Sequence, residues 1–136
     1  MKISYKARAT ATGGRAGHVR SDDGALSVDL ARPDSGRKQT NPEQLFAAAY
    51  AVSFDSALQA AALSLKLVAR DTQTSMEVGI GQNAAGGYTL DVDIFVVTRG
   101  LPEDQARRLI EAADLLCPYS SAVRGNVDVR LHVATS

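Results

Sequence analysis

The chain has 136 residues, of which 45% are hydrophobic and 22% charged, and its fifteen basic and fifteen acidic residues cancel. This length and composition predict one globular domain over residues 1–136, with a core that needs no disulfide or metal. A neutral chain argues against nucleic acid as a partner and gives no support for electrostatic binding to a membrane. No apolar run approaches the ~20 residues of a membrane span, so we expect no membrane insertion. The single cysteine, Cys117, excludes an internal disulfide and favours a cytoplasmic protein.

The first third of the chain predicts strands. Apolar and polar residues alternate over residues 2–12, which indicates a half-buried strand that ends at the two glycines 13–14. A short second strand is expected over 18–21. The Asp-Asp-Gly sequence at 22–24 favours a hairpin turn, and alternation over 26–30 then predicts a third strand.

A long helix is predicted from Asn41 to about Leu63. Asn41 suits the N-cap, Pro42 the first helical position and Gln44 the capping-box position. The helix is rich in alanine, and small residues allow another backbone to approach closely, so we expect it to be central and nearly enclosed. The stripe predicted to face the core consists of Leu45, Ala49, Val52, Ser53, Ser56, Ala60 and Leu63.

The second half repeats the rhythm of two strands and a helix without repeating the sequence. Strands are predicted over 74–80 and 88–96, and a last strand over 127–133. A helix should run from about Pro102 to about Cys117, where Pro118 disfavours its continuation. Its predicted apolar face consists of Ala106, Leu109, Ile110, Ala113 and Leu116. The order βββα-ββα-β predicts an α+β fold with antiparallel sheets packed on two main helices.

Motifs of common chemistries are weak or missing in the sequence. His18 and His132 lie far apart and the lone cysteine adds no zinc-ligand spacing, so we expect no metal site and interpret both histidines as surface strand residues. The glycine-rich segment 13–17 lacks the spacing of a phosphate loop and is interpreted as a turn. The composition is compatible with a Ser–His–Asp hydrolase, but the chain has no G-x-S-x-G elbow.

Three further residues are ambiguous when each is taken alone. Arg15 fits a solvated loop arginine, and Glu43 fits an acid placed favourably in the first turn of a helix. Cys117 fits a small buried hydrophobic residue. Periodicity alone does not bring these residues together.

Four sequence blocks occur in an order that resembles a known family. They are TATGGR at 10–15, TNPEQLFAA at 40–48, VGIGQ at 78–82 and CPYSSAVRGNVDVRL at 117–131. Together they resemble the organic hydroperoxide resistance proteins, the Ohr branch of the OsmC/Ohr superfamily, over nearly the whole chain. The resemblance implies an intertwined homodimer with two sites at the subunit interface. It also implies a thiol peroxidase that reduces organic hydroperoxides to alcohols, without a metal or bound cofactor. The implied reductant is an external dithiol, the lipoyl group of a lipoylated protein.

The resemblance assigns four site residues. Cys117 matches the resolving cysteine, Arg15 the arginine that stabilises the peroxidatic thiolate, and Glu43 the carboxylate that orients this arginine. Ser53 occupies the position of the peroxidatic cysteine, and the segment 33–39 replaces a longer glycine-rich loop of the family. We expect the four residues to converge in one pocket. Arg15 and Glu43 should lie within hydrogen-bonding reach of each other, and Ser53 within a few ångströms of the Cys117 sulfur. Because serine forms neither a thiolate nor a sulfenic acid, we expect no turnover from this chain.

Two origins of Ser53 fit the sequence, namely an engineered Cys→Ser change and natural loss of the nucleophile. The survival of Arg15, Glu43 and Cys117 favours the first, and codon 53 of the source gene distinguishes them. Three functions stay open. They are a hydroperoxide reductase scaffold inactive at Ser53, a non-catalytic module that binds hydrophobic peroxides or fatty acids, and a single-thiol redox sensor acting through Cys117. The Arg15–Glu43 pair favours the first, because a purely apolar binding site would not need it.

Overall fold

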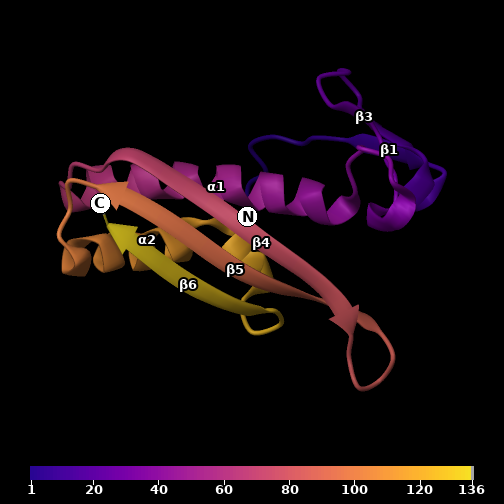
Figure 1. The fold of residues 1–136 in the computed structure, drawn as a ribbon. Coiled ribbons are helices and arrows are strands. Elements are labelled where there is room, and N and C mark those ends of the chain that lie inside the picture. Colours follow the sequence, from indigo (N-terminus) through magenta and orange to yellow (C-terminus); the bar gives the residue numbers. More distant parts are fainter. Residues whose placement is uncertain (136) are drawn as a thin grey trace. The chain divides into compact units, whose positions relative to one another are not determined.

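The computed structural model describes residues 1–135, whose elements are shown in Figure 1. By internal contacts the chain divides into two compact units, one ending at Leu45 and one beginning at Phe46, and each is described by itself. The elements follow the order βββα-ββαα-β, with two short 3-10 turns among the first strands and before the first helix. The predicted α+β class is confirmed. A single domain over residues 1–136 stays a prediction.

The first unit contains a three-stranded antiparallel sheet in the order β1–β2–β3. Its strands are β1 (Ala9–Thr12), β2 (His18–Ser21) and β3 (Ser27–Asp29). The turn between β1 and β2 requires glycine at position 17, because an added Cβ atom would lie 1.7 Å from the carbonyl oxygen of Thr12. The predicted hairpin turn at 22–24 is confirmed, since the Gly24 N–H donates to the Ser21 carbonyl at 3.0 Å.

The first strand differs from its prediction in length and in burial. β1 covers only residues 9–12, and all four of its residues are exposed, whereas a half-buried strand over 2–12 was expected. Ile3 and Tyr5, on the apolar side of the predicted strand, are also exposed. Alternation defines two faces, but burial of the apolar face requires a surface that covers it, and the single chain supplies none here.

Helix α1 (Pro42–Leu65) begins as predicted. The Gln44 N–H donates to Asn41 Oδ1 at 2.9 Å, which satisfies one of the free N–H groups of the first turn. The predicted core-facing stripe is wrong, because Val52 and Leu63 are 72% and 82% exposed. α1 is apolar around much of its circumference, so helical spacing fits more than one face. The residues that it buries are Tyr50, Phe54, Ala57, Leu58, Ala61 and Ala62.

Helix α1 also corrects the expectation that no segment is long and apolar enough to cross a membrane. By length and composition alone it passes that test, with a third of its most apolar window (33%) buried inside the chain. The core helix of a soluble protein passes the same test, so this observation is weak evidence for a membrane span.

The second unit contains a sheet in the order β4–β5–β6. Strands β4 (Arg70–Gln82) and β5 (Tyr88–Arg99) form an antiparallel hairpin. β6 (Asp128–Thr135) runs parallel to β5, so the expectation of antiparallel sheets is wrong for this one pair. Parallel neighbours need a long crossover, and two helices provide it, α2 (Glu103–Leu116) and α3 (Pro118–Val123).

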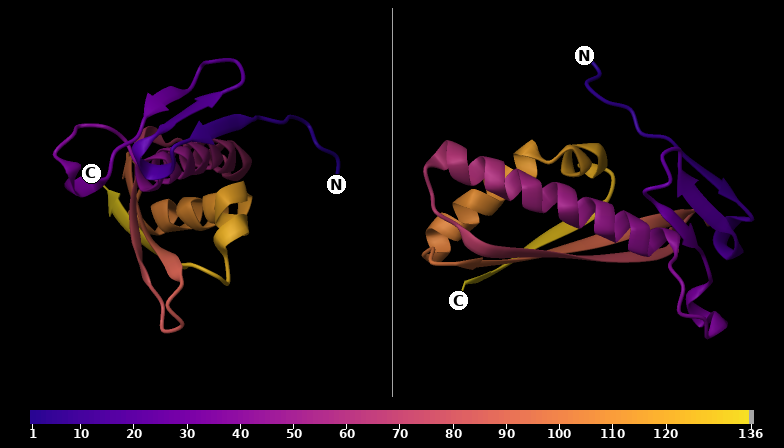
Figure 2. Two further views of the ribbon diagram at one scale, coloured as in Figure 1. Left: turned by 90° about the vertical axis from the view of Figure 1, so that its right-hand side faces the viewer. Right: turned by 90° about the horizontal axis from the view of Figure 1, so that it is seen from above.

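The core of the second unit lies between one face of this sheet and the helices, as Figure 2 shows. Val92, Ile94 and Val96 point inward from β5 and are fully buried. The predicted apolar face of α2 is confirmed at Ala106, Leu109, Ile110 and Ala113, but Leu116 is exposed. Helix α3 was not predicted, because Pro118 was interpreted only as a stop signal. Proline also suits the first position of a helix, so it ends α2 and begins α3.

Candidate active site

Ser53 and Cys117 lie in contact in the second unit. Ser53 is on α1, and Cys117 is the residue between α2 and α3. The Ser53 hydroxyl and the Cys117 sulfur are 3.5 Å apart, although the two residues are separated by 64 positions in the sequence. The short distance expected between these two positions is therefore confirmed. Cys117 is fully buried (0% exposed), so its sulfur is covered by the surrounding protein.

The break between α2 and α3 positions Cys117. Its backbone is extended (φ −70°, ψ 120°), the conformation favoured by a residue that precedes proline. Its N–H still donates to the Ala113 carbonyl at 2.8 Å, and its carbonyl accepts from the Ser121 N–H at 3.1 Å. Cys117 thus closes one helix and opens the next. Both of its backbone polar groups are satisfied, which holds the backbone of Cys117 in place between the two helices.

A buried tyrosine joins α1 to α3 beside this pair. The Tyr50 hydroxyl lies 2.7 Å from Ser120 Oγ, and its ring makes an edge-on contact with Phe46 and a tilted contact with Tyr119. Burial raises the pKa of Tyr50, which keeps its hydroxyl neutral and able to donate. Tyr50 lies one helical turn before Ser53, so the bond fastens α3 to the turn that carries Ser53.

Sequence reasoning missed Tyr50 and Ser120 as residues that organise the site. Both lie within or next to the blocks that carry the family resemblance, but nothing in the periodicity pairs them. Together with Arg124 they line a cavity of about 230 Å³. Arg124 donates to the carbonyl and the carboxylate of Asp114, at 2.8 and 3.3 Å. These bonds tie α2 to the residue that ends α3 and so help to hold the two helices on either side of Cys117 together.

Arg15 and Glu43 form a bidentate ion pair in the first unit. The two guanidinium nitrogens donate to the two carboxylate oxygens at 2.9 and 2.6 Å. The Arg15 guanidinium holds the pKa of Glu43 below its ordinary value, so the carboxylate is ionised at neutral pH. The Glu43 side chain is only 15% exposed, which limits screening by water. The expected hydrogen bonding between these two residues is confirmed.

The structure therefore brings the four expected site residues together as two pairs. Arg15 and Glu43 belong to the unit that ends at Leu45, and Ser53 and Cys117 to the unit that follows it. Their convergence in one pocket stays a prediction. Within residues 1–135, no group of three or more His, Cys, Asp or Glu side chains is placed to hold a metal ion.

Comparison with known proteins defines the class. The OsmC-like protein family matches residues 34–132. OhrB, an organic hydroperoxide resistance protein of Bacillus subtilis, is 42% identical over 133 residues, which cover 95% of this chain and 97% of the relative. An organic hydroperoxide resistance protein of Xanthomonas axonopodis pv. citri is 42% identical over 138 residues, covering 98% of this chain and 96% of that protein.

Solved structures agree with the sequence relatives. The crystal structure of an organic hydroperoxide resistance protein from Elizabethkingia anophelis superposes with a TM-score of 0.95 at 43% identity, covering 100% of both chains. The structure of Bacillus subtilis OhrB gives 0.92 at 41% identity, covering 97% of this chain and 100% of that one. The chain belongs to the OsmC/Ohr family, and its relatives of about 42% identity are organic hydroperoxide resistance proteins. These relatives support a role in defence against organic peroxides.

Proposed function

We propose that the protein is the scaffold of a thiol-dependent organic hydroperoxide reductase, and that this chain is inactive because Ser53 holds the position of the nucleophile. The observation that carries the proposal is the 3.5 Å distance between Ser53 Oγ and Cys117 Sγ. A thiol at position 53 would lie next to Cys117, the one other thiol of the chain. The relatives that match the chain over nearly its full length are organic hydroperoxide resistance proteins.

The reaction with a cysteine at position 53 balances in three steps. The thiolate attacks the distal oxygen of ROOH, the O–O bond breaks, and the alcohol ROH leaves after taking a proton. The sulfur is now a sulfenic acid, which the Cys117 thiol converts to a disulfide with release of water. An external dithiol then reduces the disulfide and is itself oxidised. We propose a lipoyl group of a lipoylated protein for this last step and no bound cofactor.

A serine at position 53 stops this cycle at its first step. Its hydroxyl is not ionised at neutral pH and has no sulfur to oxidise. It does preserve the shape of the site, because serine and cysteine differ by one atom of similar size. The contact between Ser53 and Cys117 supports this assignment, because a thiol at position 53 would have Cys117 as its neighbour.

We assign Arg15 as the cation that favours the thiolate at position 53, and Glu43 as the group that holds it. Support comes from the bidentate pair and from the family resemblance. In a Ser53→Cys background, Arg15→Ala should slow peroxide consumption more than Glu43→Ala. Glu43→Ala removes only the anchor, whereas Arg15→Ala removes the charge. If Ser53→Cys and its two double variants consume peroxide at equal rates, Arg15 and Glu43 have no role in the mechanism.

We propose a homodimer in the cytoplasm, without nucleic acid or membrane as a partner. The single chain leaves Val52 and Leu63 exposed on α1 and Ile3 and Tyr5 exposed near the N-terminus, as expected of surfaces that a second copy covers. An obligate dimer of this kind should bury more than ~2,000 Å². Light scattering that finds a folded monomer at micromolar concentration would contradict the dimer.

The experiment that tests the function compares Ser53→Cys with Ser53→Ala. With dihydrolipoamide as reductant, only Ser53→Cys should consume cumene hydroperoxide and release its alcohol, and it should prefer this bulky peroxide to hydrogen peroxide. The parent chain and Ser53→Ala should both be inactive. A folded Ser53→Cys protein that leaves the peroxide intact would refute the proposal.

Two alternatives predict other outcomes. If Ser53→Cys is inactive but the parent chain binds fatty acids tightly, the protein is a binding module. A redox sensor acting through Cys117 alone would be oxidised by peroxide in the parent chain. The complete burial of Cys117 argues against this second alternative.

A further inference from the structure

A second cluster of reactive side chains lies on the small sheet of the first unit, and the peroxidase proposal does not use it. His18 on β2 contacts two residues of β3 through its two ring nitrogens. Nδ1 lies 2.7 Å from Asp29 Oδ1, and Nε2 lies 3.0 Å from Ser27 Oγ. All three side chains belong to the part of the chain that ends at Leu45.

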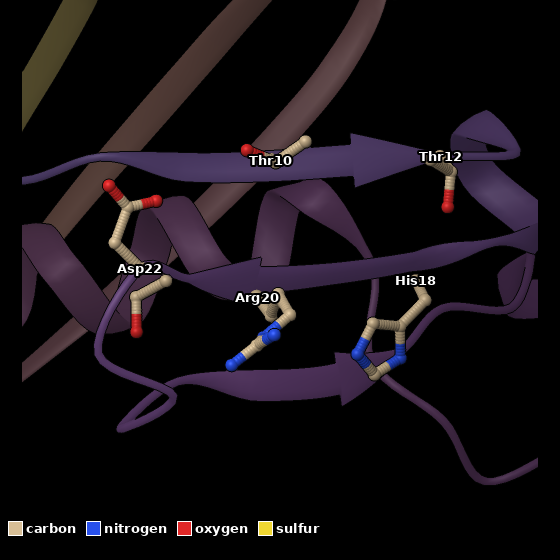
Figure 3. Close-up of a pocket in the computed structure, with 6 residues that line it drawn as sticks. Thr10, Thr12, His18, Arg20 and Asp22 are labelled. Atoms are coloured by element: carbon tan, nitrogen blue, oxygen red, sulfur yellow. The ribbon is translucent and has the colours of Figure 1, made fainter.

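The strand register explains why the three residues meet. His18 is directly opposite Asp29 in the antiparallel pair, and Arg20 is opposite Ser27. Residues two apart on a strand share a face, so all four side chains project from one side of the sheet. Figure 3 shows His18 and Arg20 projecting from β2 toward the neighbouring strand. The arrangement follows from regular β-structure and needs no strained turn.

With Asp29 ionised and His18 neutral, the two contacts define one tautomer of the imidazole. An ionised carboxylate only accepts hydrogen bonds, so Asp29 requires a proton on Nδ1 of His18. In the neutral imidazole Nε2 is then the acceptor, and the Ser27 hydroxyl must donate to it. This is the arrangement of a nucleophilic serine: the base receives the hydroxyl proton at Nε2, while a carboxylate fixes its tautomer at Nδ1.

Solvent and small molecules reach this cluster. The His18 side chain is 40% exposed and Ser27 is exposed. His18 and Arg20 also line an open depression of about 390 Å³ together with Thr10, Thr12, Ser21 and Asp22 (Figure 3). Arg20 brings a positive charge to the face that carries Ser27, where an oxyanion formed next to the serine would be stabilised.

We propose that Ser27, His18 and Asp29 form a nucleophilic triad that hydrolyses small carboxylic esters. Ser27 Oγ bonds to the carbonyl carbon of the ester while His18 Nε2 takes the hydroxyl proton. The bond from carbon to the alcohol oxygen breaks, and His18 returns the proton to the leaving alcohol. Water then repeats the sequence on the acyl-serine, so that ester and water give acid and alcohol. Because the depression is open, the substrates are small esters with good leaving groups.

The test that needs no variant is covalent labelling of the parent chain. A fluorophosphonate, which reacts with activated serine hydroxyls, should modify Ser27 in preference to the other serines, as located by peptide mass spectrometry. Ser53 lies in a different unit, so the labelled peptide distinguishes this activity from the peroxidase site. An unlabelled Ser27 in the folded protein would overturn the proposal.

Variants then test the roles of the three residues with p-nitrophenyl acetate as substrate. Ser27→Ala should abolish the burst of p-nitrophenol, and His18→Ala should slow both labelling and hydrolysis at least ~100-fold, the lower range for a general base. The matched control is Ser75→Ala, which removes an exposed serine from strand β4 and should keep the parent rate. If Ser27→Ala hydrolyses the ester as fast as the parent, the two hydrogen bonds only fasten the β2–β3 hairpin and the proposal is wrong.

Discussion

Replacing Ser53 by cysteine and oxidising the protein should join α1 to the start of α3 and raise the stability of the fold. The Ser53 hydroxyl already lies 3.5 Å from the Cys117 sulfur. A disulfide needs a separation of about 2.05 Å between its sulfurs, so the two side chains must approach by roughly 1.5 Å. Rotation about the side-chain bonds of a cysteine at position 53 can supply much of that movement.

The size of the effect follows from the loop that the bond would close. The two positions are separated by 64 residues. In the chain-entropy account, a loop of this length lowers the entropy of the unfolded chain enough to contribute about 4 kcal/mol to the free energy of unfolding. Strain in the buried site would reduce that value. With a denaturant slope of about 2 kcal/mol/M, the urea midpoint of the oxidised form should rise by up to about 2 M.

Urea unfolding of the oxidised and the dithiothreitol-reduced Ser53→Cys protein measures this effect, with Ser53→Ala treated identically as the control. Because we propose a dimer, both forms are compared at the same protein concentration. Mass spectrometry should show the loss of two hydrogens within one chain. An oxidised form no more stable than the reduced form, or a disulfide only between chains, would show that the contact between the two positions does not support the bond.

Three further changes test individual contacts. Because Arg15 lowers the folded-state pKa of Glu43 below its ordinary 4.5, the ion pair stabilises the fold above about pH 4.5 and loses this contribution as the pH falls through the lower value. Glu43→Gln should therefore flatten the acid side of a stability–pH curve measured by thermal unfolding, and an unchanged curve would contradict the pair's role. Asn41→Ala removes the cap of α1 and should lower the free energy of unfolding by about 1 kcal/mol, measured by urea titration. Asn41→Asp keeps a capping oxygen and should retain most of that stability. Tyr50→Phe leaves the buried Ser120 hydroxyl without its partner and should cost about 1–3 kcal/mol in the same titration, a loss that the double variant with Ser120→Ala should partly restore.

Local signals in the sequence identified most of the secondary structure. The cap at Asn41, the turn at Gly24 and the apolar face of α2 all depend on residues within a few positions of one another. Backbone preferences and the local spacing of apolar and polar residues set such short-range geometry, so the sequence predicts it. The stop at Pro118 was also read correctly, but its second effect, the start of α3, was missed.

The site was predicted only because long sequence blocks resemble a known family. Nothing in composition or periodicity pairs Arg15 with Glu43, or Ser53 with Cys117 across 64 residues. The same limit applied to Ser27, His18 and Asp29. No motif marks them as a group, because the residues that form such a cluster are set by the register of two strands.

The sequence by itself indicated most of the helices and strands, apart from the true length of β1 and the whole of α3, and it showed which family the chain resembles. Only the tertiary structure decided which side of α1 is buried, because a helix that is apolar around much of its circumference can pack through several faces. It also decided that β6 runs parallel to β5, a choice made by the crossover through α2 and α3. Local preference fixes the elements, whereas the contacts of Cys117 and His18 depend on packing and pairing between elements, which no single segment encodes.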